Sequence, residues 1–199
     1  VGAVHVPIYP TISESDYKYI LNHAEVKYVI VSGKEILQKI EHFLPEIPSL
    51  KGVYSFNPVE GVKHFNELVE LGKENQDNES LSSLMAAVAP ADVATLIYTS
   101  GTTGNPKGVM LSHNNMLSNL LDLYHIFPVD DTCKCLSYLP VSHVYERTNL
   151  YIYQYLGVSI YYAENMGTIA DNLKEIRPEM FTTVPRLLEK VYDKIISKG

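Results

Sequence analysis

The chain is short of cysteine, of basic residues and of long apolar segments. It has two cysteines in 199 residues, and 16 lysines and arginines stand against 23 aspartates and glutamates, which gives a net charge of −7. Without a long basic run an extended nucleic-acid surface is not expected, although a locally positive nucleotide pocket is compatible with this balance. No apolar run reaches the length of a membrane span, and the first residues are not expected to act as a signal peptide.

The two cysteines, Cys133 and Cys135, lie two positions apart on a predicted strand, so their side chains point to the same face. Neighbours of this kind are poorly placed for a disulfide. No further ligands at suitable spacing support a metal site. We therefore expect two half-buried thiols in a reducing compartment and no metal bound by these residues.

Apolar segments typical of strands alternate with segments of helical periodicity through most of the chain. Strands are predicted at 4–8, 26–31, 52–56, 93–97, 109–111, 134–139, 157–161 and 180–184, and helices at 13–23, 36–43, 65–72, 112–125, 141–155, 168–176 and 185–196. This alternation is typical of an α/β fold, with largely parallel, layered sheets flanked by helices. The polar segment 73–91 is predicted to link a first lobe, residues 1–72, to a second, residues 92–199.

The most informative segment is a loop that follows the apolar run 93–97 and reads Tyr98-Thr99-Ser100-Gly101-Thr102-Thr103-Gly104-Asn105-Pro106-Lys107-Gly108. Glycines let the backbone approach a ligand closely. Backbone N–H groups and hydroxyls can surround an anion, and a lysine adds a mobile positive charge. The loop is therefore a candidate phosphate site for a nucleotide.

This loop differs from the P-loop of kinases and NTPases, in which a glycine precedes the lysine and Ser or Thr follows it. Here Pro106 precedes Lys107 and Gly108 follows it. Residues 109–111 have the pattern of a strand, and a helix is predicted only from Ser112, so we expect the loop to join two strands. The alternative is a flexible hairpin tip without function, which would require neither the lysine nor the run of hydroxyls.

A second group of chemically versatile side chains follows the strand predicted at 134–139. His143, Glu146 and Arg147 lie at i, i+3 and i+4, so they share one face of the next predicted helix. Ligands of open α/β sheets bind at the carboxyl ends of strands, which makes His143 or Arg147 a candidate contact for a carboxylate or phosphate. The alternative is a surface ion pair of Glu146 with Arg147 beside a histidine that caps the helix.

Arg186 repeats this design, because an apolar strand and Pro185 precede it and a helix is predicted to follow. A cation at a helix N-terminus is not favoured by the helix dipole. We therefore expect Arg186 either to have an anionic partner or to be solvated at the surface.

The segment from Tyr98 to Gly108, with the residues 109–115 after it, resembles the signature loop of the AMP-forming adenylating enzymes. That superfamily includes acyl-CoA synthetases, luciferases and peptide-synthetase adenylation domains. Three other segments, residues 2–10, 139–147 and 184–192, are similar to the long-chain fatty acid–CoA ligase branch. The resemblance covers essentially the whole chain and implies an internal part of the large N-terminal domain.

The resemblance implies a reaction in two steps. A fatty carboxylate attacks the α-phosphorus of ATP, which releases pyrophosphate, and the thiol of CoA then attacks the acyl-adenylate. Lys107 and His143 would take part in catalysis. The residues implied for the phosphates are Thr99, Ser100, Gly101, Thr102, Thr103, Gly104 and Lys107, and those on the acyl side are His143, Glu146, Arg147 and Arg186.

Other features of the family do not occur in this sequence. No Tyr-Gly pair follows the loop, and with it are missing the glutamate for Mg²⁺, the aspartate for the ribose and the C-terminal lysine. We therefore expect a fragment, inactive by itself, of a cytoplasmic ligase that uses ATP, Mg²⁺, CoA and a fatty acid and binds no nucleic acid. A ligase for an aryl or shorter-chain acid, or a non-catalytic nucleotide-binding module, is the alternative. Peripheral membrane contact and self-association of the fragment stay open.

Overall fold

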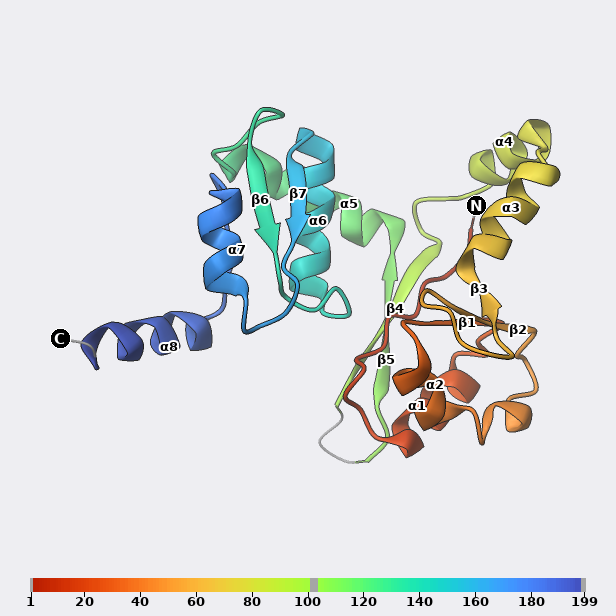
Figure 1. Cartoon of the computed structure of the whole chain (residues 1–199). Helices are drawn as coiled ribbons and strands as arrows, with labels where there is room; N and C mark the ends of the chain where they lie inside the picture. The colour runs from red at the N-terminus through yellow and green to blue at the C-terminus, as the bar shows by residue number, and fades with distance from the viewer. Residues whose placement is uncertain (1, 101–103, 198–199) are drawn as a thin grey trace. The chain divides into compact units, whose positions relative to one another are not determined.

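The computed structural model describes residues 2–100 and 104–197, and the chain falls into two compact units, residues 1–114 and 115–199 (Figure 1). The first unit contains α1 (Glu14–His23), β1 (Tyr28–Val31), α2 (Lys34–Ile40), the 3-10 helix η1 (Leu44–Glu46), β2 (Gly52–Ser55), β3 (Lys63–His64), α3 (Phe65–Glu74), α4 (Asn78–Ala86), β4 (Val93–Thr99) and β5 (Lys107–Ser112). α5 (His113–Leu123) begins at the boundary, and η2 (Tyr124–Ile126), β6 (Lys134–Ser137), α6 (Val144–Leu156), β7 (Ser159–Tyr162), α7 (Ile169–Ile176) and α8 (Pro185–Ile196) follow.

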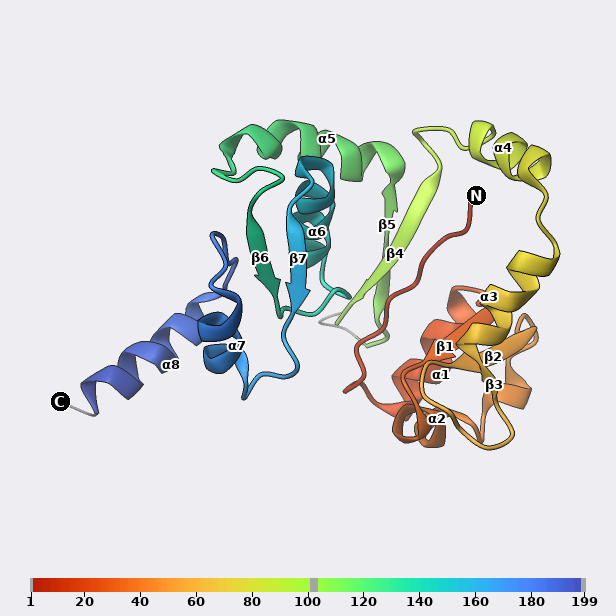
Figure 2. The ribbon, with the colours of Figure 1, turned by 45° about the horizontal axis from the view of Figure 1, so that its top comes forward.

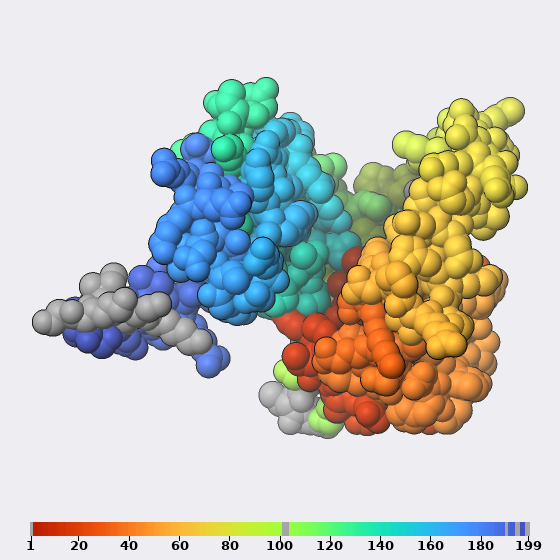
Figure 3. All heavy atoms as spheres, in the orientation of Figure 1, coloured from red at the N-terminus to blue at the C-terminus, as the bar shows by residue number. Residues whose placement is uncertain are grey.

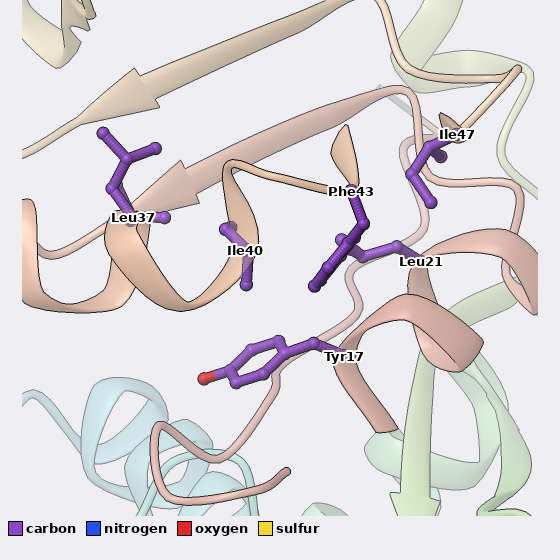
Figure 4. Close-up of a cluster of buried hydrophobic side chains, with 7 residues drawn as sticks. Tyr17, Leu21, Leu37, Ile40, Phe43 and Ile47 are labelled. Carbon is purple, nitrogen blue, oxygen red and sulfur yellow. The ribbon is translucent and has the colours of Figure 1, made fainter. Parts of the chain in front are cut away.

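The first unit is built on a parallel sheet with the strand order β1-β2-β3. α1 and α2 pack against it, and Figure 4 shows side chains from both helices converging on one core. That core consists of Tyr17, Leu21, Val31, Leu37, Ile40, Phe43 and Ile47. The sequence predicted β1 as a buried strand, but Tyr28 and Ile30 are 56% and 44% exposed, so β1 buries only one of its faces.

α1 begins where its capping pattern predicted. The Oγ of Ser13 accepts a hydrogen bond from the backbone N–H of Asp16 at 3.1 Å, which satisfies one of the free donors of the first turn. Acidic Glu14 and Asp16 in the first turn and His23 in the last match the helix dipole. The predicted helix at 13–23 is confirmed.

Two predicted strands are wrong, because each is reduced to an isolated bridge. In the segment 4–8, His5 pairs with Thr95 of β4, and in the segment 180–184, Met180 pairs with Cys135 of β6. Proline has no N–H to donate to a strand ladder. Pro7 interrupts the first segment and Pro185 ends the second, so neither extends its pairing.

The segment 73–91, predicted as a polar linker, contains the end of α3 and the whole of α4. Every residue of α4 is exposed, and Figure 3 shows the atoms of α3 and α4, in yellow, at the surface. By compactness, β4 and β5 group with the residues before them, whereas the sequence analysis placed 92–199 in one lobe. The division into two lobes stays a prediction.

The second unit is built on β6 and β7, which pair in parallel and lie side by side in Figures 1 and 2. α6 packs on this pair through a core that contains Cys135, Leu150, Tyr153 and Val158. Both cysteines are free, and burial raises the pKa of the Cys135 thiol to about 12. With parallel pairs in both units and helices against them, the predicted α/β fold is confirmed, although β4 and β5 are antiparallel.

Within the described ranges, no helix combines the length and the apolar character that are required to cross a bilayer. In the same part of the chain, His, Cys, Asp and Glu side chains do not gather in threes around a position for a metal ion.

Candidate functional site

The glycine-rich loop connects two antiparallel strands. β4 and β5 pair from Val93 opposite Ser112 to Thr99 opposite Lys107, so the loop occupies the tip of a hairpin. This confirms that the loop joins two strands, and no helix begins at the lysine, since α5 starts at His113. The loop therefore lacks the geometry of a P-loop, in which a helix begins at the lysine.

The described residues of the loop present polar groups to solvent. Thr99, Ser100, Gly104 and Lys107 are all exposed, and Thr99 and Lys107 face each other across the hairpin. Gly104 has φ +128°, a conformation that favours glycine, and a Cβ added to it would meet no atom within 4 Å. An ammonium group, hydroxyls and open backbone fit the oxygens of a polyphosphate. Gly101, Thr102 and Thr103, also predicted for the phosphates, lie outside the described residues.

The base of the loop, at the tip end of the hairpin, is fixed by Tyr98. Its hydroxyl lies 2.7 Å from Nδ1 of His23 at the end of α1, and the ring of His23 stacks on Tyr19 with 5.2 Å between centroids. Gly108 is paired with Tyr98 across the hairpin, and a Cβ on Gly108 would lie 3.0 Å from Cζ of the tyrosine. Burial, and secondarily the nearby Tyr19, raises the pKa of Tyr98. We call Tyr98, His23 and Gly108 the hairpin anchor.

In the second unit, His143 caps α6. Its Nδ1 accepts a hydrogen bond from the backbone N–H of Tyr145 at 3.2 Å, and its side chain is exposed. The capping role that the sequence analysis gave as the alternative is thus confirmed for His143. Because one ring nitrogen serves the helix, Nε2 is the nitrogen that can meet a ligand.

Glu146 and Arg147 do not share an exposed face with His143. Their exposed fractions are 1% and 8%, so the surface ion pair that the sequence analysis gave as the alternative is wrong. The Nε and Nη2 of Arg147 donate to the hydroxyl of Tyr151 at 3.3 and 3.2 Å, and the guanidinium carbon lies 5.8 Å from the centre of that ring. The side chain of Glu146 points into the unit, where it accepts a hydrogen bond from the hydroxyl of Ser137.

Glu146 belongs to a buried polar cluster, which consists of Ser137, Glu146, Asn149, Tyr153 and Thr182. Burial raises the pKa of Glu146, and the neighbouring Ser137, Thr182 and Asn149 offset part of this rise. Four buried polar atoms of this cluster make no hydrogen bond of good geometry: Oε2 of Glu146, Nδ2 of Asn149, the Tyr153 hydroxyl and Oγ1 of Thr182. Burial also raises the pKa of Tyr153 to about 12.

The sequence analysis missed four members of this cluster. Glu146, Asn149 and Tyr153 lie at i, i+3 and i+7, a spacing that puts them on one helix face and could have been read as polar residues facing inward. Thr182 carries no such signal, because it comes from a distant segment.

Arg186 lies in the first turn of α8 and is exposed. The predicted start of this helix at Pro185 is confirmed. Exposure at this position fits solvation, and it also leaves the guanidinium accessible to an anion.

Comparison with known proteins identifies the family of the chain. The model of the family described as AMP-binding enzyme matches residues 1–197. The chain belongs to this family. A peroxisomal long chain acyl-CoA synthetase 6 of Arabidopsis thaliana is 35% identical over 98% of the chain, and long-chain-fatty-acid–CoA ligase 5 of Rattus norvegicus is 33% identical over 96%. The crystal structure of a long-chain-fatty-acid-CoA ligase from Archaeoglobus fulgidus superposes with a TM-score of 0.78, at 26% identity over 96% of the chain and 37% of that structure.

The two curated relatives are much longer than this chain, which spans 28% and 30% of their lengths. The family match establishes that this region belongs to the AMP-binding, adenylate-forming family. The predicted resemblance to the superfamily and to its long-chain branch is confirmed.

Proposed function

We propose that these residues are the phosphate-binding and acyl-side part of an AMP-forming long-chain fatty acid–CoA ligase. The observation that carries the proposal is the β4–β5 hairpin, in which Lys107 lies opposite Thr99. The loop between them contains Gly104, whose φ is positive. The long-chain branch is supported by relatives that bear this name and match nearly the whole chain.

In this proposal the hairpin holds the β- and γ-phosphates of ATP. The ammonium of Lys107 neutralises charge as pyrophosphate leaves, and the hydroxyls of Thr99 and Ser100 and the loop backbone orient the phosphate oxygens. The protein chiefly positions groups and stabilises charge in such phosphoryl chemistry. Mg²⁺ and CoA belong to the proposed reaction as well, and we assign no residue of this chain to either.

On the acyl side, Nε2 of His143 and the guanidinium of Arg186 are the exposed groups suited to a carboxylate or to the entry of the acyl chain. Arg147 and Glu146 would act differently, because both are buried. We propose that Arg147 orders α6 through its hydrogen bonds to Tyr151. The expected site of action is the cytoplasm, with membrane contact limited to the surface.

Fatty-acid-dependent ATP–pyrophosphate exchange tests the function. The ligase that contains these residues should catalyse exchange with long-chain acids better than with short-chain or aryl acids, and residues 1–199 alone should catalyse none. Exchange that peaks with an aryl or short-chain acid would replace the long-chain assignment. Absence of exchange with every acid, together with retained nucleotide binding, would support a non-catalytic nucleotide-binding module instead.

A further inference from the structure

We propose that Glu146 is a positioning residue, which fixes the loop 138–143 and the segment 179–184 at the carboxyl end of β6. It thereby sets the places of His143, at the end of the loop, and of Arg186, just after the segment. What those two residues bind rests on the proposed function, whereas the positioning itself does not.

A side-chain hydrogen bond closes the loop 138–143. Ser137 is the last residue of β6, and Glu146 lies in the first turn of α6. The hydrogen bond from the Ser137 hydroxyl to Oε1 of Glu146 therefore joins the two ends of the loop through side chains that are 3% and 1% exposed. His143 caps the same helix from within this closed loop, so its ring is placed by the helix start that Glu146 ties to the strand.

The segment after α7 docks on β6. The backbone N–H groups of Glu179 and Met180 reach the carbonyl of Lys134 at 3.0 and 3.4 Å, and there the backbone pairing with β6 ends.

Side chains continue the attachment. The ring of Phe181 stacks on Tyr138 at 5.1 Å, and the hydroxyls of Thr183 and Tyr138 lie 2.7 Å apart. Between these two residues, the side chain of Thr182 is buried, and its hydroxyl, like Oε2 of Glu146, has no hydrogen bond of good geometry. The docked segment thus rests on Tyr138, next to the residue that Glu146 holds at the start of the loop.

Position 146 holds a carboxyl group, although it is buried. A buried carboxyl costs free energy unless its partners compensate, and well-packed apolar residues are often as stable as buried charged groups. Oε2 of Glu146 has no hydrogen bond of good geometry, so maximal stability does not account for the residue. An apolar side chain could fill the space, but it could not accept the hydrogen bond from Ser137 that closes the loop.

Two substitutions in the full-length ligase test the inference. Glu146→Gln keeps an acceptor oxygen and the shape, and Glu146→Leu keeps only the volume. Glu175→Leu, at an exposed position on α7, is the matched control. The readouts are hydrogen exchange of residues 138–143 and 181–184, and kcat and KM measured separately for ATP and the fatty acid.

We expect Glu146→Leu to accelerate hydrogen exchange in both segments together. It should lower kcat/KM for the fatty acid roughly 10- to 100-fold, because misplacement by about 1 Å can cost two orders of magnitude. The KM for ATP should stay within a factor of about two, since Glu146 has no part in the proposed phosphate site. Glu146→Gln should restore both segments and most of the activity.

A folded Leu variant with wild-type exchange in the two segments would overturn the inference, whatever its activity. If the Leu variant does not fold, Ser137→Ala and Thr182→Val replace it. Ser137→Ala should accelerate hydrogen exchange in the adjacent loop 138–143 and also in 181–184, and Thr182→Val should do so in 181–184 and also in the loop. Faster exchange in only one of the two segments would contradict the proposal that Glu146 positions both. If the wild-type ligase lacks exchange activity with every fatty acid, the proposed function fails, while the hydrogen-exchange results still decide the positioning.

Discussion

The hairpin loop and the buried polar cluster carry polar groups in opposite ways. In the hairpin, Thr99 and Lys107 are exposed, and the anchor of Tyr98 and His23 holds the base of the loop. In the cluster, Glu146 and Thr182 are buried and contact other protein groups. Exposed polar groups cost little and can meet a ligand, whereas buried ones are costly unless they interact with one another. The difference separates residues that touch a substrate from residues that place them.

The largest effect should follow from loss of the exposed cation. Lys107→Met removes the charge at the hairpin and should lower kcat/KM for adenylation by about 10²–10³, as for other groups that stabilise developing charge. ATP–pyrophosphate exchange measures this loss. Lys63→Met, at an exposed lysine in β3, is the control and should leave exchange unchanged. A fall of less than threefold in the Lys107 variant would remove the lysine from the proposed phosphate site.

The next effect should arise at the hairpin anchor. Gly108→Ala places a Cβ about 3.0 Å from the Tyr98 ring, so the ring or the strand must move. Such overpacking costs roughly 1–3 kcal/mol, which should appear as a lower opening free energy of the β4 and β5 amides in native-state hydrogen exchange. Gly72→Ala, in α3 with no atom within 4 Å, should instead stabilise its helix by about 0.5–1 kcal/mol. Equal effects at both glycines would show that the close approach has no consequence.

The sequence predicted the hairpin well because its chemistry is local. A glycine, a lysine and hydroxyls within one short segment define the loop, and the apolar runs on either side define its strands. The helix at 13–23 was equally accessible, since Ser13 and Asp16 are close in sequence.

The buried cluster could not be predicted in the same way. Glu146 and Thr182 meet only after α7 and the segment 179–184 have folded back along β6. Glutamate and arginine are usually exposed, and only the tertiary fold turned both side chains inward. For the same reason β1 seemed buried on both faces from its apolar run, although Tyr28 and Ile30 are exposed.

A smaller effect should appear as a dependence on pH. Because the pKa of Glu146 is raised in the folded protein, the native state keeps this proton to a higher pH than the unfolded state does. Stability from this group is therefore complete below the ordinary pKa of about 4.3 and declines as the pH rises through the raised value, by at most about 1.4 kcal/mol per pH unit. The thiol of Cys135 and the hydroxyl of Tyr153, with pKa values of about 12, stay protonated throughout.

Glu146→Gln should abolish this decline. The measurement is the opening free energy of the β6 and α6 amides between about pH 4 and 8, corrected for the intrinsic exchange rate at each pH. The advantage of the Gln variant over the wild type should grow with pH. Parallel profiles would mean that the carboxyl keeps an ordinary pKa, and the buried cluster would then resemble the exposed hairpin in its electrostatics.

The smallest effect should come from the hydroxyl of the hairpin anchor. Tyr98→Phe removes only the hydrogen bond to His23, and a hydrogen bond of this kind contributes about 0.5–1.5 kcal/mol. His23 is exposed, so water can replace the lost partner, and we expect a loss near 0.5 kcal/mol in the opening free energy of β4. Tyr162→Phe, at a tyrosine that is 62% exposed, should change nothing in β4. A loss in Tyr98→Phe as large as that in Gly108→Ala would show that the hydrogen bond, rather than the packing of the ring on the glycine, holds the loop, and the hairpin would then depend on a defined polar contact as the buried cluster does.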